Sequence, residues 1–121
     1  MPNPVVHFEV HGSDPAKSQK FYADLFGWAI DANNPQSYGM VSTGGEGTKG
    51  VTGGIAGGMG ATMVTFYVEV DDLEATLAKA EAQGGKRVME PADIEGGPTI
   101  AMFSDPDGNV IGLTKSGTMG G

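Results

Sequence analysis

Both histidines of the chain and a carboxylate share one face of a short segment near its start. The residues Val5–His11 alternate apolar and polar side chains, which is the pattern of a half-buried strand. On such a strand His7, Glu9 and His11 point the same way, and the valines and phenylalanine between them point to a core. A histidine beside a carboxylate can act as a general base near neutral pH. The residue types therefore predict a site on this face, with His7 and Glu9 as candidate catalytic residues.

The composition excludes several classes of function. Fifteen acidic and seven basic residues give the 121-residue chain a formal charge of -8, which repels phosphate backbones and suits a basic ligand. The absence of cysteine excludes disulfides and thiolate nucleophiles. No apolar stretch approaches the ~20 residues that cross a bilayer, and residues 1–4 carry no export signal. We therefore expect a cytoplasmic protein with neither nucleic acid nor membrane as a partner.

The first half of the chain continues from the opening strand into a helix. Asp14 is placed to cap a helix over 15–26, and Gly27 is placed to end it. Four large apolar residues of this helix lie three and four positions apart and are expected in the core: Phe21, Tyr22, Leu25 and Phe26. Short strands are expected at 28–30, 38–42 and 52–56. The glycine-rich residues 44–60 contain a G-x-G-x-x-G match, but no helix follows it, so we expect a flexible hairpin and a linker.

The second half of the chain repeats this order. Alternation over 63–70 predicts a strand, Asp72 caps a helix that runs to about Gln83, and Leu73 and Leu77 belong to the core. Strands follow at 86–89, 99–104 and 109–114. The acids of Asp105–Gly108 could suggest a metal site, but proline at the second position and glycine at the fourth are typical of a turn, which we favour.

A shift of 58 residues superposes the two halves, since Val6 falls on Val64 and Asp14 on Asp72. The chain is therefore expected to be an α+β protein made of two tandem βαβββ modules, over about 4–57 and 62–115 of a single domain, 1–121. Neither module could bury its sheet alone, so we expect a curved mixed sheet with the helices on the outside.

This duplication resembles the vicinal oxygen chelate superfamily of glyoxalases, bleomycin-resistance proteins and extradiol dioxygenases. The resemblance covers nearly the whole chain. Its most specific parts are Val6-His7-Phe8 with Asp14, the run Phe21-Tyr22…Leu25-Phe26-Gly27-Trp28, Val70-Asp71-Asp72-Leu73, Gly84-Gly85, and Phe103-Ser104-Asp105-Pro106-Asp107-Gly108-Asn109. One fold hosts unrelated chemistries, so the resemblance predicts the fold more closely than the reaction.

The resemblance also implies where a divalent metal would be held, by His and Glu ligands from both modules. The first ligand position is occupied by His7, the third by Thr65 and the fourth by Gly112, and the only acid near the second is Glu46. A catalytic metal needs about three protein ligands, so we predict no metal and no other cofactor. A displaced metal site built from His7, Glu9, His11 and Glu69 stays open as an alternative.

The resemblance places the polar faces of the two equivalent strands in one concave cleft. The residues expected to line it are His7, Glu9, His11, Trp28, Tyr38, Thr65, Tyr67, Glu69 and Gly112. The alternative is an ordinary solvated sheet face, on which Glu9 and Glu69 pair with neighbouring basic groups.

The favoured function is metal-independent binding of a small molecule, as in antibiotic-resistance proteins of the family. A lyase, isomerase or dioxygenase-like enzyme with a non-standard metal or with His7 as base, and a scaffold with a vestigial cleft, are the alternatives. Members of the superfamily commonly form homodimers, and we expect one here.

Overall fold

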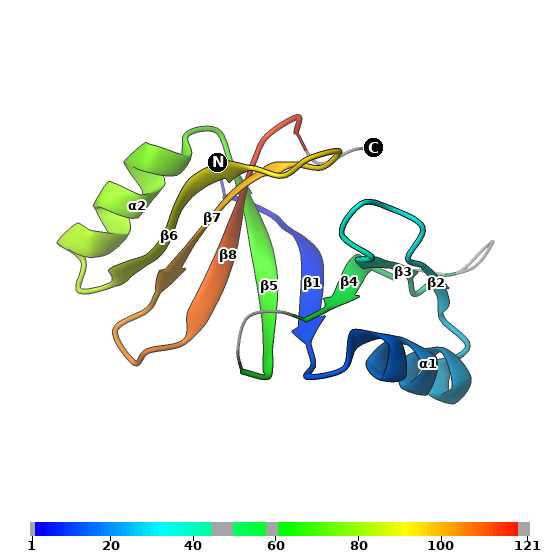
Figure 1. The fold of residues 1–121 in the computed structure, drawn as a ribbon. Helices are drawn as coiled ribbons and strands as arrows, with labels where there is room; N and C mark the ends of the chain where they lie inside the picture. The colour runs from blue at the N-terminus through cyan, green and yellow to red at the C-terminus, as the bar shows by residue number, and fades with distance from the viewer. Residues whose placement is uncertain (1, 45–49, 58–60, 119–121) are drawn as a thin grey trace. The chain divides into compact units, whose positions relative to one another are not determined.

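The chain folds into two βαβββ modules, as the sequence predicts (Figure 1). The computed structural model describes residues 2–44, 50–57 and 61–118. The elements in chain order are β1 (Val5–His11), α1 (Pro15–Phe26), β2 (Ala29–Asp31), β3 (Gly39–Ser42), β4 (Thr52–Ala56), β5 (Met63–Val70), α2 (Leu73–Ala82), β6 (Lys86–Asp93), β7 (Thr99–Ser104) and β8 (Val110–Lys115). The α+β class and the order of elements are therefore confirmed.

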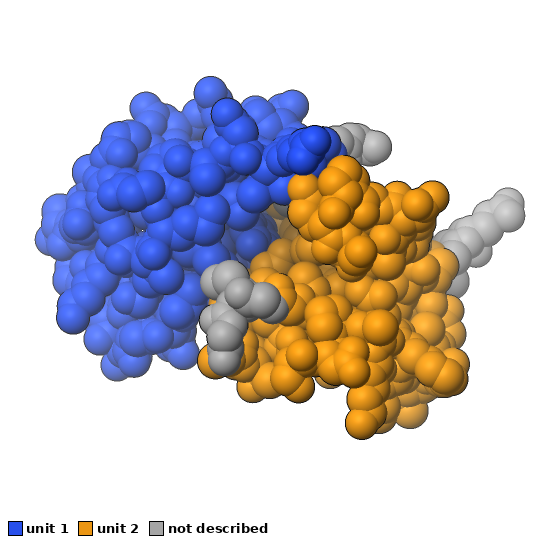
Figure 2. Space-filling model, in the orientation of Figure 1, with its two compact units in different colours: residues 1–5, 66–121 blue, residues 6–65 orange. Residues whose placement is uncertain are grey.

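The chain divides into two compact units (Figure 2). In chain order, the first consists of residues 6–65, drawn in orange as unit 2, and the second consists of residues 66–121 together with 1–5, drawn in blue as unit 1. The sheet of the first unit has the strand order β2-β3-β4-β1. β1 and β4 are parallel, and the other neighbours are antiparallel. The parallel pair brings Glu9 opposite Gly54, which are 45 positions apart in the chain. The sheet is mixed, as predicted.

Helix α1 begins and ends where its capping residues predict. The Asp14 carboxylate accepts a hydrogen bond from the Lys17 backbone N–H at 3.2 Å, and Pro15 occupies the first turn. Gly27 ends the helix with a φ of 71°, in the left-handed region, and its N–H donates to the Ala23 carbonyl at 2.9 Å. Local side-chain chemistry thus defines both ends of the helix.

The predicted core face of α1 is wrong. Phe21, Leu25 and Phe26 are 58%, 59% and 56% exposed, and no residue of this helix is fully buried. The less exposed face instead carries Gln19, whose side-chain amide donates to the Ile55 carbonyl of β4 at 2.9 Å, and Tyr22, whose ring stacks on Trp28. A hydrogen bond and a ring contact therefore set the rotation of the helix, and the apolar stripe does not.

The second unit has the strand order β5-β8-β7-β6, with β5 and β8 parallel. Its helix α2 is capped by Asp72, whose carboxylate accepts from the Ala75 N–H at 2.9 Å. This helix packs on β6, β7 and β8. The resulting core cluster consists of Val70, Leu73, Leu77, Ala101 and Leu113, so the core assignment of the two leucines is confirmed. No helix among the described residues is long and apolar enough to span a membrane.

The acidic segment between β7 and β8 is a turn, as predicted. The Gly108 N–H donates to the Asp105 carbonyl at 2.9 Å, which closes a four-residue turn. The Asp105 carboxylate accepts hydrogen bonds from the backbone N–H groups of Asp107 and Asn109, both at 2.9 Å. The hydrogen bond from the Asn109 side chain is the largest cause of the lowered pKa of Asp105, and the backbone bonds lower it further. The carboxylate is therefore occupied by its own turn.

Candidate functional site

The polar face of β1 is the more buried of its two faces, contrary to the expectation that Val6, Phe8 and Val10 point to the core. His7, Glu9 and His11 are only 6%, 6% and 7% exposed, whereas Val6, Phe8 and Val10 between them are half-buried. The solvated-face alternative is therefore wrong for these three residues. Buried polar groups need hydrogen-bond partners to offset the loss of water, and the structure supplies them except at His11 Nδ1, which has none among the described residues.

These partners form a connected cluster, the His7 network, which consists of His7, Glu9, His11 and Tyr38. The Tyr38 hydroxyl lies 2.7 Å from His7 Nε2 and donates to Glu9 Oε2 at 2.7 Å. The other carboxylate oxygen, Oε1, accepts from His11 Nε2. The buried carboxylate thus contacts Tyr38 and His11 directly and is linked to His7 through Tyr38. Its pairing with His11 is what the solvated-face alternative expected.

The environment of His7 favours its neutral form. Burial lowers the pKa of His7 below its ordinary value of 6.5, and the charge of Glu9 opposes part of that change. The imidazole is therefore uncharged at neutral pH, which is the state required of a general base or of a hydrogen-bond acceptor. Its ring also stacks on Tyr38, with the centroids 6.2 Å apart and the planes 18° apart.

Trp28 is not brought together with the His7 network. Its ring packs against Phe8 and Phe26, at centroid distances of 5.6 and 5.0 Å, and stacks on Tyr22. Successive side chains of a strand point to opposite faces, so the contact with Phe8 places Trp28 on the face of β1 away from His7. Tyr38 joins the candidate site, and Trp28 belongs to the packing between α1 and its sheet.

The equivalent residues of β5 are also largely buried. Thr65 is 5% exposed and Tyr67 is 4% exposed, whereas Glu69 is half-buried. Tyr67 lies opposite Gly112 on the neighbouring strand β8. A Cβ atom at residue 112 would lie 2.5 Å from the Tyr67 ring, so the ring occupies the space that a side chain there would need.

The two modules share this arrangement of glycine and tyrosine. The 58-residue shift that relates the modules converts the strand pair Glu9 and Gly54 into the pair Tyr67 and Gly112. A Cβ atom at residue 54 would overlap the Tyr38 hydroxyl, as one at 112 would overlap the Tyr67 ring. In each module a glycine on the last strand therefore accommodates a tyrosine ring.

These residues do not fit the divalent metal that the family resemblance implies. Gly112 has no side chain, and a carboxylate there would displace Tyr67. The Nε2 atom of His7 is engaged by Tyr38. Glu46 lies outside the described residues. Within residues 2–44, 50–57 and 61–118, no group of three or more His, Asp or Glu side chains is placed to hold a metal ion.

The residues of the displaced metal site are engaged with one another and with Tyr38. Glu9 Oε2 accepts from the Tyr38 hydroxyl and Oε1 accepts from His11 Nε2, and His7 Nε2 lies 2.7 Å from the same hydroxyl. Among the residues that the structure describes, His7, Glu9, His11 and Glu69 do not form a group placed to hold a metal ion.

A groove of about 320 Å³ lies at a different place, on the second unit. It is lined by Thr76, Lys79, Ala80, Gln83, Gly85, Phe103, Ser104, Asp105 and Pro106. These residues belong to α2 and the residues that follow it, to the end of β7 and to the turn after it. None is a predicted site residue, and none belongs to the His7 network.

Sequence reasoning missed two residues that place Tyr38. Asn34 holds the backbone of Tyr38 with its side-chain amide, and Gly54 leaves room for the hydroxyl. The turn signal Asn33-Asn34-Pro35 and the pair Gly53-Gly54 are visible in the sequence. Their connection through Tyr38 depends on the pairing of β3 with β4, which no local pattern specifies.

Comparison with known proteins agrees with the fold. The chain is 30% identical over 115 residues to CFP32 of Mycobacterium tuberculosis, which carries the name of a glyoxylase, covering 89% of this chain and 44% of that protein. It is 29% identical over 131 residues to the anthracycline biosynthesis protein DnrV of Streptomyces peucetius, covering 94% of this chain and 47% of that protein. The chain thus spans a little under half the length of these two relatives.

A solved structure has the same fold over nearly all of the chain. It is a glyoxalase/bleomycin resistance protein/dioxygenase superfamily member from Vibrio splendidus, with a TM-score of 0.62 and 21% identity, covering 95% of this chain and 100% of that one. The family model described as "Glyoxalase/Bleomycin resistance protein/Dioxygenase superfamily" matches residues 5–113. The chain therefore belongs to the glyoxalase/bleomycin resistance protein/dioxygenase superfamily.

Proposed function

We propose that this protein binds a small cationic aromatic molecule without a metal, at the face of β1 that carries the His7 network. The observation that supports this proposal is a buried carboxylate, Glu9, held by the His11 imidazole and the Tyr38 phenol. Desolvating a carboxylate costs free energy, and proteins concentrate such arrangements at functional sites. The network would orient the ligand and supply negative charge.

Charge and aromatic surface together favour this class of ligand. The net charge of -8 attracts a cation. The stacked rings of His7 and Tyr38 offer an aromatic surface beside the carboxylate. DnrV, a relative by sequence, is named for anthracycline biosynthesis, and an anthracycline is a planar aromatic molecule with a cationic amino sugar. The metal-independent mode follows from Gly112 and Tyr67, whose packing leaves no side chain where the fourth metal ligand would be needed.

Calorimetric titration with doxorubicin, in buffer containing EDTA, tests this proposal. We expect binding of doxorubicin and none of anthraquinone-2-sulfonate, an aromatic anion. A ligand at 100 times its Kd should also stabilise the folded protein by about 2.7 kcal/mol. If the chain binds neither compound, or binds doxorubicin only after nickel, zinc, iron or manganese is added, the proposal is wrong.

Variants locate the ligand. Glu9→Gln removes the buried charge and is expected to weaken doxorubicin binding at least tenfold, about 1.4 kcal/mol. Asp24→Asn removes the same charge from an exposed side chain of α1 and should leave the affinity unchanged. Tyr38→Phe, which keeps the ring, is the second variant if Glu9→Gln fails to fold. Equal affinity in wild type, Glu9→Gln and Tyr38→Phe would place the ligand elsewhere.

The second candidate function is acid–base catalysis by His7. The supporting observation is that burial lowers the pKa of His7, so the imidazole is a neutral base at neutral pH, next to the Tyr38 hydroxyl. A Vibrio parahaemolyticus relative that carries the name lactoylglutathione lyase is 28% identical over 124 residues, covering 93% of this chain and 90% of that protein. Turnover of the methylglyoxal–glutathione hemithioacetal, with loss in His7→Gln, is the expected result.

The predicted homodimer is part of the same proposal. Sedimentation velocity of the wild-type protein over a range of concentrations measures the oligomeric state. We expect a dimer mass at the concentrations used for titration, and a monomer mass throughout would contradict this part of the proposal without affecting ligand binding.

A further inference from the structure

We propose that Tyr38 fixes the tautomer of His7, with the proton on Nε2, so that Nδ1 is the acceptor atom of this imidazole. The inference begins with the number of protons in the network. A tyrosine hydroxyl has one proton, and an ionised carboxylate can only accept. Since Tyr38 lies 2.7 Å from Glu9 Oε2 and donates to it, its proton is spent there.

In the hydrogen bond between Tyr38 and His7, the imidazole must then be the donor and the hydroxyl oxygen the acceptor. The hydroxyl oxygen lies 2.7 Å from His7 Nε2 and has only lone pairs left to offer. Nε2 must therefore carry a proton and donate it to Tyr38. Because His7 is neutral at neutral pH, its other nitrogen, Nδ1, carries no proton. Whatever group lies against Nδ1 must donate a hydrogen bond to it.

The loop before β3 is built to hold Tyr38 in this place. The Asn34 side chain makes two hydrogen bonds to the Tyr38 backbone: its amide donates to the carbonyl at 2.6 Å, and its oxygen accepts from the N–H at 2.9 Å. Ser37, the preceding residue, has a φ of 52°, which is uncommon for a residue other than glycine. Such local strain persists only where the surroundings impose it and clusters at functional sites.

The sheet below Tyr38 is shaped for the same purpose. Gly54 lies opposite Glu9 on the parallel strand, and any side chain at residue 54 would overlap the Tyr38 hydroxyl. The adjacent Gly53 lies opposite Phe8, and a side chain there would overlap the Phe8 ring on the other face. The two neighbouring glycines therefore make room for two rings on opposite faces of the sheet. The Tyr38 ring belongs to the His7 network, and the Phe8 ring does not.

This assignment has consequences for chemistry at the site, and these rest on the proposed function. Any group that contacts Nδ1 of His7 must be a hydrogen-bond donor, such as an ammonium, hydroxyl or amide group. General-base catalysis by His7 would use Nδ1. Nε2 is occupied by a proton shared with Tyr38 and is not available to a metal ion. Tyr38 and Asn34 are positioning residues in this scheme.

Nitrogen NMR of the imidazoles tests the inference directly. The chain has only two histidines, so ¹⁵N-histidine labelling gives two ring systems, and the signals lost in His7→Gln belong to His7. In ligand-free wild-type protein at neutral pH, we expect a protonated Nε2, an unprotonated Nδ1 and an Hε2 resonance that exchanges slowly with water. A protonated Nδ1 with an unprotonated Nε2 would overturn the inference, and this measurement is made on the wild-type protein, with His7→Gln used only for assignment.

Matched variants then assign the effect to Tyr38. Tyr38→Phe and Gly54→Ala should abolish the slow Hε2 resonance of His7, whereas Gly53→Ala, an equal change on the other face, should keep it. Asn34→Ala should accelerate its exchange, and Asn33→Ala, at an exposed neighbour, should not. An Hε2 resonance unchanged in both Tyr38→Phe and Gly54→Ala would overturn the role of Tyr38. All spectra are recorded without ligand, so a failure of the binding proposal leaves this test intact.

Discussion

The ring of Tyr67 lies where a side chain at Gly112 would begin. A Cβ atom at residue 112 would be 2.5 Å from Tyr67 Cδ2, a distance that requires one of the two to move. Both residues are deep in the sheet, on the paired strands β5 and β8, and Tyr67 is only 4% exposed. The space implied for the fourth metal ligand of the family is thus filled by an aromatic ring.

This relationship predicts the effect of adding one methyl group. Gly112→Ala should lower the free energy of unfolding by about 1–3 kcal/mol, the usual cost of overpacking a dense core. A double-mutant cycle with Tyr67→Ala, measured by urea denaturation, tests the cause. The alanine at 112 should cost much less once the ring is gone. Additive effects of the two substitutions would show that Tyr67 does not restrict residue 112.

The buried imidazole predicts a pH dependence of stability. The pKa of His7 is lowered in the folded state, so the unfolded chain, with a histidine pKa near 6.5, takes up the proton more readily. The contribution of His7 to stability is therefore complete above pH 6.5 and is lost as the pH falls below that value. The slope cannot exceed about 1.4 kcal/mol per pH unit for one group.

Chemical denaturation between pH 5 and pH 8 measures this slope. His7→Gln should flatten it, because the substituted side chain does not titrate. The carboxyl groups of Glu74 and Asp105, whose pKa values are also lowered, lose their contributions at lower pH, below their ordinary values of 4.5 and 3.8. A slope between pH 5 and 6.5 that is the same in wild type and His7→Gln would contradict the prediction.

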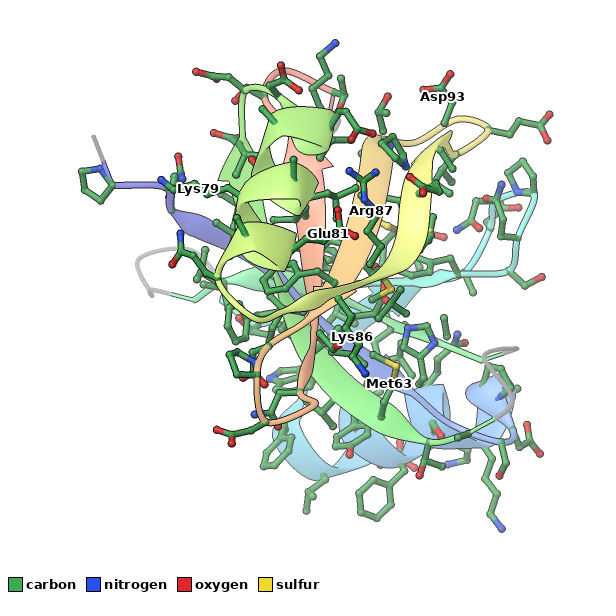
Figure 3. All side chains as sticks on the ribbon, turned by 90° about the vertical axis from the view of Figure 1, so that its left-hand side faces the viewer. Met63, Lys79, Glu81, Lys86, Arg87 and Asp93 are labelled. Atoms are coloured by element: carbon green, nitrogen blue, oxygen red, sulfur yellow. The ribbon has the colours of Figure 1, made fainter. Side chains whose placement is uncertain are left out.

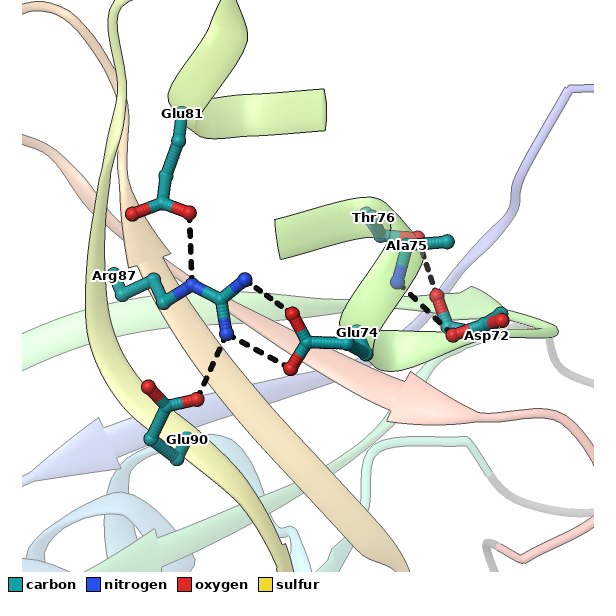
Figure 4. A network of polar contacts seen from close by, with 7 residues as sticks. All are labelled: Asp72, Glu74, Ala75, Thr76, Glu81, Arg87 and Glu90. Carbon is teal, nitrogen blue, oxygen red and sulfur yellow. Dashed lines mark hydrogen bonds and ion pairs between the residues drawn. The ribbon is translucent and has the colours of Figure 1, made fainter. Parts of the chain in front are cut away.

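Arg87 of strand β6 contacts three carboxylates, two on helix α2 and one on its own strand (Figure 4). Its Nε donates to Glu81 at 2.8 Å, its Nη1 donates to Glu74 and to Glu90, both at 2.9 Å, and its Nη2 donates to Glu74. The hydrogen bond to Arg87 is the main cause of the lowered pKa of Glu74. The planar guanidinium suits this geometry better than an ammonium does.

Arg87→Ala should therefore lower the Tm by several degrees, and Arg87→Lys should recover only part of the loss. Lys86→Ala removes the same charge from the adjacent position, which points away from α2 (Figure 3), and should change the Tm little. Scanning calorimetry at low and high salt measures these differences, which should shrink as salt screens the charges. Equal losses in the Arg87→Ala and Lys86→Ala variants would mean that net charge, and not the network, is responsible.

The two helices should respond differently to loss of a leucine. Leu77 of α2 is 0% exposed and lies in the core cluster, so Leu77→Ala should cost about 2–5 kcal/mol of unfolding free energy. Leu25 of α1 is 59% exposed, and Leu25→Ala should stay within about 0.5 kcal/mol of wild type. Urea denaturation of both variants is the measurement. A large cost at Leu25 would show that its face of α1 is covered in solution.

The sequence by itself determined the elements of this fold and their repetition. Aspartates 14 and 72 cap the two helices, and the turn at 105–108 closes on its own carboxylate, because these signals act over three or four residues. The 58-residue repeat and the family resemblance then gave the order of the modules. Capping, turn formation and alternation are local interactions, so they can be read without knowledge of the partners.

Only the tertiary structure decided which faces are buried and which polar groups meet. An alternating strand does not reveal that its polar side will be the buried one, because that depends on Tyr38, from the loop before β3, which donates a hydrogen bond to Glu9. The stripe of Phe21 and Leu25 was predicted to be the packed face of α1. The contacts of this helix are instead made by Gln19 and Tyr22. The glycines opposite Glu9 and Tyr67 are visible in the sequence as residues without a side chain. Their meaning depended on strand register, which long-range pairing alone defines.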